Sequence, residues 1–270
     1  MTLQRTGILT ALAGLLACAS LGAQVAANTP TPRTADGKPD LTGVYQASTR
    51  RGAWDFEAPG EQPGQPAGGS TPVNASTRDP IPFQEWARQK AQEYLNRRSV
   101  DDPTTLCIPQ PSPRITPVGL FPIEFVQTKA KIVILYEWFG AFRSIPIGRP
   151  LADDIEPAFL GNSVAHWEGD TLVIEASHFQ EGGWVTNGAF TSDALRVTER
   201  FTRVDRDQMN YEAIIEDQKV FTKPWSIRTT LMLREDARVR EYVCNENNLD
   251  PDRYREYLKN PSLFSRTPPQ

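Results

Sequence analysis

Histidine and cysteine are scarce in this chain, whose 270 residues include only 2 His and 3 Cys. So few side chains of these two types exclude a cysteine-rich scaffold and argue against a histidine-rich metal site. We therefore expect neither a metal nor another cofactor. Basic residues are not in excess either, because the formal net charge is −4. The sequence thus lacks the positive surface that a nucleic-acid-binding protein needs.

The sequence fingerprints of several large enzyme classes are also missing. The chain contains no Gly-x-Ser-x-Gly elbow, no P-loop and no dinucleotide-binding fingerprint. What it does contain is 39% hydrophobic and 23% charged residues, which is enough apolar material to build a core. Composition therefore predicts a folded domain of ordinary size without indicating a reaction.

The N-terminus has the pattern of a secretory signal peptide, which we place at residues 1–27. Arg5 supplies a positive charge ahead of an apolar run at residues 7–22, which is shorter than a membrane-spanning helix. Small residues then precede a cleavage point after Ala27. We expect a periplasmic or secreted protein with no membrane span. The alternative is a lipoprotein anchored at Cys18, where the sequence loosely resembles a lipobox.

Cleavage at that point would leave Cys107 and Cys244 as the two cysteines of the mature chain. An oxidising compartment favours a disulfide between them. The alternative is a pair of buried free thiols, which pack as small hydrophobic side chains. A disulfide would join the segment before the first core strands to the last strand of the domain.

Proline divides the mature chain into two parts. Fifteen of the 23 prolines lie between residues 30 and 122. This composition predicts an irregular, proline-rich arm over residues 28–114. A short strand at 39–45 and an amphipathic helix at 83–97 interrupt the arm. Residues 115–270 are expected to form the main domain.

Alternating β-branched, aromatic and polar residues in this domain predict about nine strands with short connections. The strands are expected at residues 123–128, 131–138, 141–147, 164–168, 171–176, 194–204, 209–222, 225–233 and 239–245. No long crossover helix separates them, which argues against a parallel α/β sheet. The pattern favours an all-β fold, an antiparallel up-and-down barrel, followed by a short helix that begins at Asp250.

Several segments resemble known proteins. Residues 40–45 resemble the Gly-x-Trp opening of the calycins, the lipocalin-like barrels, with Tyr45 in place of the tryptophan. Four more specific segments are WEGDTLV at 167–173, ALRVTERF at 194–201, TKPW at 222–225 and CNEN at 244–247. Together they resemble an exported bacterial family of unassigned function. The resemblance implies a lipocalin-like barrel and carries no catalytic residues.

Strand parity predicts that Glu199 points into the barrel, because its neighbours on the same strand face are apolar. Glu137 and Glu246 are weaker candidates for an inward carboxylate. A glutamate in a low-dielectric interior has a raised pKa and suits general acid–base catalysis. The alternative is structural: an inward glutamate pairs with an arginine such as Arg143.

The other acid–base candidates are His166 and His178, because the ordinary pKa of histidine lies near neutral pH. His178 opens a glycine-rich segment, residues 179–188, whose composition is typical of a mobile lid at a barrel mouth. If the flanking strands pair, the two histidines would lie near the same rim. The alternative for each is a surface or hydrogen-bonded histidine.

Four aromatic residues and one arginine are the candidate ligand contacts: Trp138, Arg143, Trp184, Tyr211 and Trp225. Aromatic residues inside a barrel are equally well explained as core. The first functional hypothesis is an exported protein that binds a small apolar or aromatic molecule. The second is a cofactor-independent lyase, isomerase or hydrolase that uses the glutamate and a histidine. The third is a structural or interaction protein of the cell envelope.

Overall fold

The computed structural model describes residues 30–47, 81–116, 121–152, 154–186 and 188–264. The predicted signal peptide and Cys18 lie outside these residues, as does the proline-rich stretch at 48–80.

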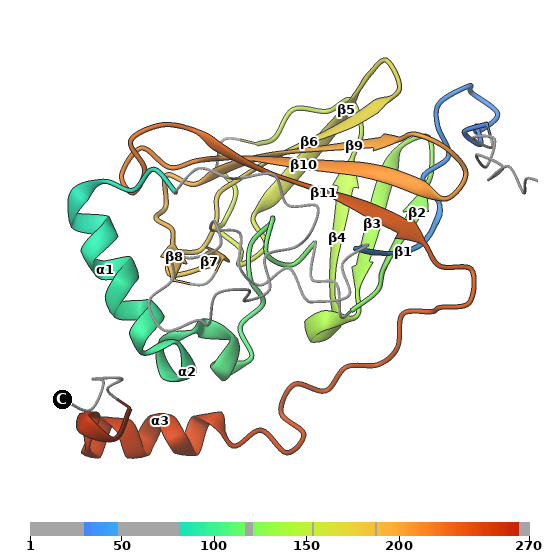
Figure 1. Ribbon diagram of the computed structural model, residues 1–270. Coiled ribbons are helices and arrows are strands. Elements are labelled where there is room, and N and C mark those ends of the chain that lie inside the picture. The colour runs from blue at the N-terminus through green and yellow to red at the C-terminus, as the bar shows by residue number, and fades with distance from the viewer. Residues whose placement is uncertain (1–29, 48–80, 117–120, 153, 187, 265–270) are drawn as a thin grey trace, which may run out of the picture.

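A nine-stranded antiparallel sheet curls into a nearly closed barrel (Figure 1). In sheet order the strands are β4 (Ala141–Pro146), β3 (Lys131–Tyr136), β2 (Ile123–Gln127), β1 (Gly43–Ala47), β11 (Trp225–Leu233), β10 (Gln208–Glu216), β9 (Arg196–Arg203), β6 (Thr171–Ser177) and β5 (Asn162–Glu168). A separate hairpin contains β7 (Trp184–Thr186) and β8 (Ala189–Phe190). Barrel strands that follow one another in the chain are neighbours in space, as an up-and-down barrel requires. The predicted all-β barrel is confirmed.

The two edge strands of the sheet, β4 and β5, meet along a line that we call the seam. Nine strands that alternate in direction leave one parallel pair where the ring closes. An isolated parallel bridge joins Ile147 to Ala165, and the amide of Gly148 donates to the Ala165 carbonyl at 2.7 Å. A full ladder is not formed between these edges in the described chain. The seam is therefore the least continuous part of the barrel wall.

Alternate residues of each barrel strand face the core. On β9, Val197, Glu199 and Phe201 are buried, whereas Arg196 and Arg200 are not. This is the period of two that an extended chain imposes on its side chains. The parity predicted for Glu199 is confirmed, and a carboxylate does lie among apolar core residues.

The strand expected at residues 239–245 does not form. Its place beside β11 is taken by β1 from the proline-rich arm, where Tyr45 lies opposite Leu233. Because β10 pairs with the other edge of β11, both edges of that strand are occupied. Residues 234–249, the C-terminal segment, instead continue as turns and irregular chain.

Three α-helices and three short 3₁₀ helices accompany the strands in the described residues. They are α1 (Glu85–Asn96), α2 (Arg98–Asp101), α3 (Asp250–Lys259), η1 (Pro103–Leu106), η2 (Trp138–Gly140) and η3 (Pro261–Phe264). The amphipathic helix predicted at 83–97 and the C-terminal helix are thus confirmed. Within the part of the chain that the structure describes, none of these helices has the length and apolar character needed to cross a membrane.

Helix α1 packs against the β7–β8 hairpin (Figure 1). Its buried face includes Ala87 and Ala91, and the ring of Tyr94 lies 5.3 Å from that of Trp184. Trp184 and Val185 are themselves buried. The part of the expected lid (residues 179–188) that contains Trp184 and Val185 is therefore a hairpin packed against α1.

Residues 108–116, which we call the plug segment, enter the barrel from one end. Buried positions here include the polar residues Gln110, Ser112, Arg114 and Thr116. The hydroxyl of Thr116 lies 3.3 Å from the carboxylate of Glu199 on β9, inside the barrel. The interior is therefore occupied in part by chain that precedes the first strand of the predicted main domain.

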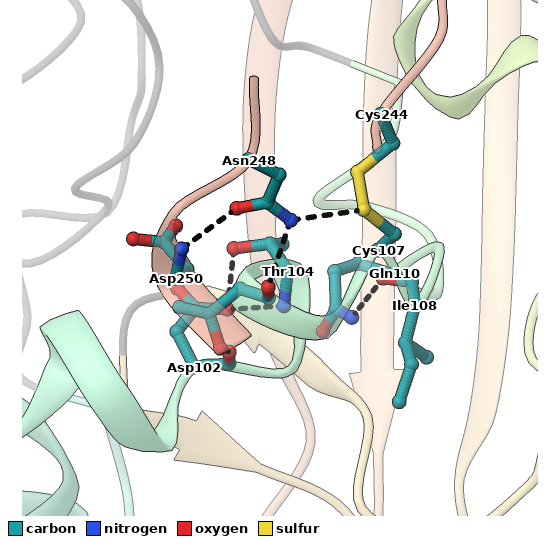
Figure 2. The surroundings of a disulfide bond; sticks show 9 residues. Asp102, Thr104, Cys107, Ile108, Gln110, Cys244, Asn248 and Asp250 are labelled. Atoms are coloured by element: carbon teal, nitrogen blue, oxygen red, sulfur yellow. Dashed lines mark hydrogen bonds between the residues drawn. A yellow bond between two sulfur atoms is a disulfide. The ribbon is translucent and has the colours of Figure 1, made fainter. Parts of the chain in front are cut away.

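A disulfide between Cys107 and Cys244 fastens the start of the plug segment to the C-terminal segment, with an S–S distance of 2.06 Å. Figure 2 shows Asn248 beside the bond, where its Nδ2 donates to Cys107 Sγ at 3.4 Å and to the Thr105 carbonyl at 3.2 Å. The predicted pairing is confirmed. Its predicted partner element is not, because Cys244 lies beyond the last strand rather than on it.

Candidate functional site

The barrel interior holds an ion pair between Glu199 of β9 and Arg143 of the edge strand β4. Oε2 of Glu199 lies 2.5 Å from Nη1 of Arg143, and the two side chains are 0% and 3% exposed. A buried carboxylate without a counter-charge is strongly disfavoured, because removal from water costs several kcal/mol per ion. Arg143 therefore explains how Glu199 can occupy a core position.

The second carboxylate oxygen of Glu199 is engaged as well. Oε1 accepts hydrogen bonds from the hydroxyl of Tyr211 at 2.9 Å and from that of Thr116 at 3.3 Å. Donors from β4, β10 and the plug segment thus converge on one carboxylate. These contacts account for the burial of Glu199 as a structural ion pair, without assigning it a proton-transfer role.

Arg143 extends from this pair to the seam. Its Nη1 also donates to Ser112 Oγ at 3.1 Å and to the Tyr136 hydroxyl at 3.4 Å. Its Nη2 donates to Ser163 Oγ on β5 at 2.8 Å, which carries a side-chain hydrogen bond across the seam. The N–H at Nε is buried and has no hydrogen-bond partner in the structure.

Two opposing effects act on the charge of Arg143. Burial alone would lower the pKa of its guanidinium, but the adjacent Glu199 carboxylate and the Tyr136 hydroxyl outweigh burial and raise that pKa above its ordinary value. Arg143 consequently stays protonated throughout the stable pH range of the protein. Arg143 and Glu199 form an ion pair, so the two side chains together carry no net charge.

A groove of about 520 Å³ lies along the seam, between β4, β5 and the loop that joins them. Phe142 and Phe159 line it and are 65% and 43% exposed, and Leu151 adds further apolar surface. Ser163 contributes polar lining, and Arg143 also borders the groove, with a side chain that is 3% exposed. This volume lies within the range of ~300–1,000 Å³ that is usual for small-molecule sites.

A glycine allows the loop to reach β5 at the groove. Gly161 has φ +68°, and a Cβ atom there would lie 2.5 Å from the ring of the buried Phe179. Both the backbone conformation and the close approach favour glycine at this position. The shape of the groove at this end therefore depends on Gly161.

The predicted ligand contacts are divided by the structure. The aromatic members are core residues that are at most 8% exposed: Trp138, Trp184, Tyr211 and Trp225. Arg143 is the predicted contact that lines the groove. Sequence reasoning missed Phe142 and Phe159. Phe142 lies between Ala141 and Arg143 on β4, and the buried residues of that strand lie on its other face. Strand alternation could therefore have indicated that Phe142 is exposed.

Two of the core tryptophans hold the plug segment in place. The Arg114 guanidinium lies 5.9 Å from the ring of Trp138 and 5.8 Å from that of Trp184, within cation–π distance of both. Its charge is balanced by Asp102, whose carboxylate lies 2.6 Å from Nη2. Gln110 accepts the backbone N–H of Trp184 at 2.9 Å. These aromatic residues therefore contact the protein's own chain.

His166 lies on the outer face of β5, opposite Val173 of β6. Its half-exposed ring lies 3.3 Å from the carboxylate of Glu168. Since Val173 precedes His178 by five residues, the two histidines are separated by roughly 17 Å of extended chain. The expectation that they share one rim is wrong, because pairing about the turn places them toward opposite ends of the β5–β6 hairpin.

His178 follows the end of β6, and its Nδ1 lies 2.9 Å from Ser177 Oγ. Glu199 pairs across the sheet with Ile174. That residue precedes His178 by four positions, roughly 13 Å along an extended strand. The structure therefore does not bring His178 and Glu199 to one reacting position.

The weaker carboxylate candidates do not face the barrel interior. Glu137 accepts a hydrogen bond from the backbone N–H of Arg240 at 2.9 Å, at the periphery of the barrel. Glu246 is exposed in the C-terminal segment, because the strand expected there does not form. Within the described ranges, no group of three or more His, Cys, Asp or Glu side chains is placed to hold a metal ion.

Alkaline pH is expected to destabilise the protein through its buried tyrosines. Burial raises the pKa of Tyr45 to about 12 and also raises the pKa values of Tyr136 and Tyr211. Unfolded tyrosines ionise near pH ~10. For Tyr45 the stabilising contribution of the neutral phenol is therefore fully present below pH ~10 and is lost as pH rises toward about 12.

The Tyr45→Phe variant isolates one of these groups, since the Tyr45 hydroxyl has no hydrogen-bond partner. Between pH ~9 and ~12 it should lose about 2 kcal/mol less stability than the wild type. Urea unfolding at a series of pH values measures the difference. Identical pH dependence of the two proteins would contradict the assignment.

Comparison with known proteins adds no assignment: no protein-family model matches the chain, and no curated protein matches it.

Proposed function

We propose that this is an exported protein that binds a small apolar or aromatic molecule in the groove at the seam. The observation that carries the proposal is the pair of exposed phenylalanines, Phe142 and Phe159, beside a concave surface of about 520 Å³. Small-molecule sites combine such apolar walls with a few fixed polar groups. Ser144, Asn162 and Ser163 line the groove and supply such polar groups.

The rigidity of the polar groups supports the same proposal. Arg143 is held by Glu199 and Ser112 inside the barrel and by Ser163 at the seam. A side chain that is fixed before a ligand arrives loses little conformational entropy when it binds. The hydroxyl of Ser163 at the groove is thus held in place by Arg143 before any ligand binds.

Export to an oxidising compartment accounts for two further features. The Cys107–Cys244 disulfide is of a kind that persists in secreted and periplasmic proteins. The N-terminal sequence has the charge and hydropathy pattern of a signal peptide. We propose that the mature chain acts outside the cytoplasm, as the resemblance to exported bacterial proteins also implies.

Binding of an uncharged fluorescent aromatic probe, N-phenyl-1-naphthylamine, should test the groove. Phe142→Ser and Phe159→Ser should each weaken binding about tenfold, since burying part of a phenylalanine contributes about 1.4 kcal/mol. A fluorescence titration measures the dissociation constants. Val126→Ser is the matched control, because Val126 is 39% exposed on β2 and does not line the groove.

The control variant should bind the probe within about twofold of the wild type. Equal affinity of all four proteins would show that the probe binds elsewhere and would refute the groove as the site. Absence of saturable binding to the wild type would refute the proposed function for aromatic molecules of this size.

A further inference from the structure

We propose that the natural ligand is a zwitterion of the amino-acid type, in which an aromatic or aliphatic body carries one carboxylate and one ammonium group. This inference rests on the proposed binding in the groove at the seam and names the class of ligand. Two observations lead to it. A second groove adjoins the first, and exposed arginine and glutamate side chains stand in that second groove without pairing with one another.

The second groove, which we call the charged groove, has a volume of about 570 Å³ and lies over β5, β6, β9 and the end of β10. It shares the lining residues Pro150, Leu151 and Val164 with the groove at the seam. The two grooves therefore adjoin at the loop between β4 and β5. One small molecule can place an apolar body against Phe142 and a polar head in the charged groove.

The charged side chains that line this second groove are balanced in sign. Two are arginines and two are glutamates, and all four residues are exposed to solvent: Arg149, Arg196, Glu175 and Glu216. The ring of His166 also lines the groove and lies 4.0 Å from the carboxylate of Glu175. Because positive and negative side chains are equal in number, the groove does not favour a ligand of one sign alone.

Arg196 and Glu216 occupy directly opposite positions on β9 and β10. Cβ atoms in such positions lie only ~5 Å apart. Within the part of the chain that the structure describes, however, the two exposed side chains do not form an ion pair. Another arginine on the outer face of β9, Arg200, is paired with Glu168 at 2.7 Å. The charges of Arg196 and Glu216 therefore remain available to a ligand.

A zwitterionic head satisfies both of these side chains. The guanidinium of Arg196 can donate two parallel hydrogen bonds to a carboxylate, and an ammonium group can donate to the carboxylate of Glu216. Arg149, on the loop between the two grooves, offers a second guanidinium. A ligand with a carboxylate alone would face the negative charge of Glu216, and a ligand with an ammonium alone would face that of Arg196.

Three probes with one ring system and one spacer separate these possibilities: 3-(2-naphthyl)alanine, 3-(2-naphthyl)propionate and 2-(2-naphthyl)ethylamine. The propionate lacks the ammonium group and the amine lacks the carboxylate. The amino acid should bind the wild-type protein about fivefold more tightly than either, because each of the others loses one ion pair with the groove. Isothermal titration calorimetry measures the three dissociation constants.

Variants at the charged groove assign the two ends of the head. Arg196→Gln should weaken binding of the amino acid and the propionate about fivefold, without weakening that of the amine. Glu216→Gln should weaken binding of the amino acid and the amine about fivefold, without weakening that of the propionate. Arg228→Gln is the control, because Arg228 is exposed on β11 and lines neither groove. It should change each affinity by less than about twofold.

The position of the body is tested by Phe142→Ser, which should weaken binding of the amino acid about tenfold, as for the uncharged probe. An unchanged affinity would overturn the inference, because the head would then bind without the body. Insensitivity of the amino acid to Arg196→Gln or to Glu216→Gln would overturn it as well.

N-phenyl-1-naphthylamine reports on the groove at the seam independently, because it is uncharged. If this probe binds but the three charged probes have equal affinities, or the propionate or the amine binds most tightly, the inference is overturned and the proposed function is not. Failure of N-phenyl-1-naphthylamine to bind would instead refute the proposed function, and the inference with it.

Discussion

Glu199→Gln is expected to lower the free energy of unfolding by about 3–5 kcal/mol. The change leaves the Arg143 guanidinium buried, at 3% exposure, without the carboxylate that lies 2.5 Å from it. Arg143→Met should cost a similar amount, since it leaves the Glu199 carboxylate uncompensated in the core. Urea unfolding followed by circular dichroism measures both losses.

The double variant Arg143→Met/Glu199→Leu should recover most of this loss. Replacing both members of a buried ion pair by apolar residues of similar volume is often neutral or stabilising. A residual cost of about 1–3 kcal/mol is expected, because the hydroxyl of Tyr211 loses its acceptor. A double variant that is less stable than either single variant would contradict this account of the pair.

An exposed ion pair on the outer face of the barrel provides the matched control. Arg228 of β11 donates from Nε to Glu212 of β10 at 2.7 Å, and the arginine side chain is mostly in solvent. Glu212→Gln should therefore cost less than about 1 kcal/mol. Equal destabilisation by Glu212→Gln and Glu199→Gln would show that burial does not set the strength of the inner pair.

Loss of the disulfide is the second change with a large expected effect. Replacing Cys107 and Cys244 by serine should lower the free energy of unfolding by about 2–5 kcal/mol, because the bond closes a loop with a sequence separation of 137. For a domain of this size the corresponding fall in Tm is roughly 5–15 °C. Thermal unfolding with and without dithiothreitol measures the shift.

The effect should be concentrated at the barrel end that carries the plug segment. The disulfide and the hydrogen bonds of Asn248 link the C-terminal segment to η1 and to Cys107, the residue that follows it (Figure 2). Limited proteolysis of the reduced protein should therefore cut first within residues 234–249. Dithiothreitol should not change the Tm of the double serine variant. An unchanged Tm in the reduced wild type would contradict the prediction.

Local pattern was sufficient for the elements whose partners are close in sequence. The β3–β4 and β5–β6 hairpins, helix α1 and the inward position of Glu199 all follow from periodicity within a few residues. The prediction of a last strand was wrong because of a residue contact between distant parts of the chain. Residues 239–245 have the composition of a strand, but β1, which is distant in sequence, occupies the edge they would need.

The candidate site was predictable only in part. Arg143 was identified both as a ligand contact and as a partner for an inward glutamate, and the structure places it between Glu199 and the groove. The groove itself could not be predicted, because it exists only where β4 and β5 meet after the ring has closed. The exposure of Phe142 and Phe159 is likewise a property of that closure.

The position of β1 sets how much of the chain is needed to complete the barrel wall. β1 lies between β2 and β11, paired with both, so it completes the wall although it precedes the other barrel strands by a long stretch of chain. A fragment that begins at residue 115 would expose the backbone donors and acceptors of two strand edges, which invites pairing with other chains. It would also lack most of the plug segment. The smallest cooperative folding unit of this protein therefore reaches back at least to Gly43.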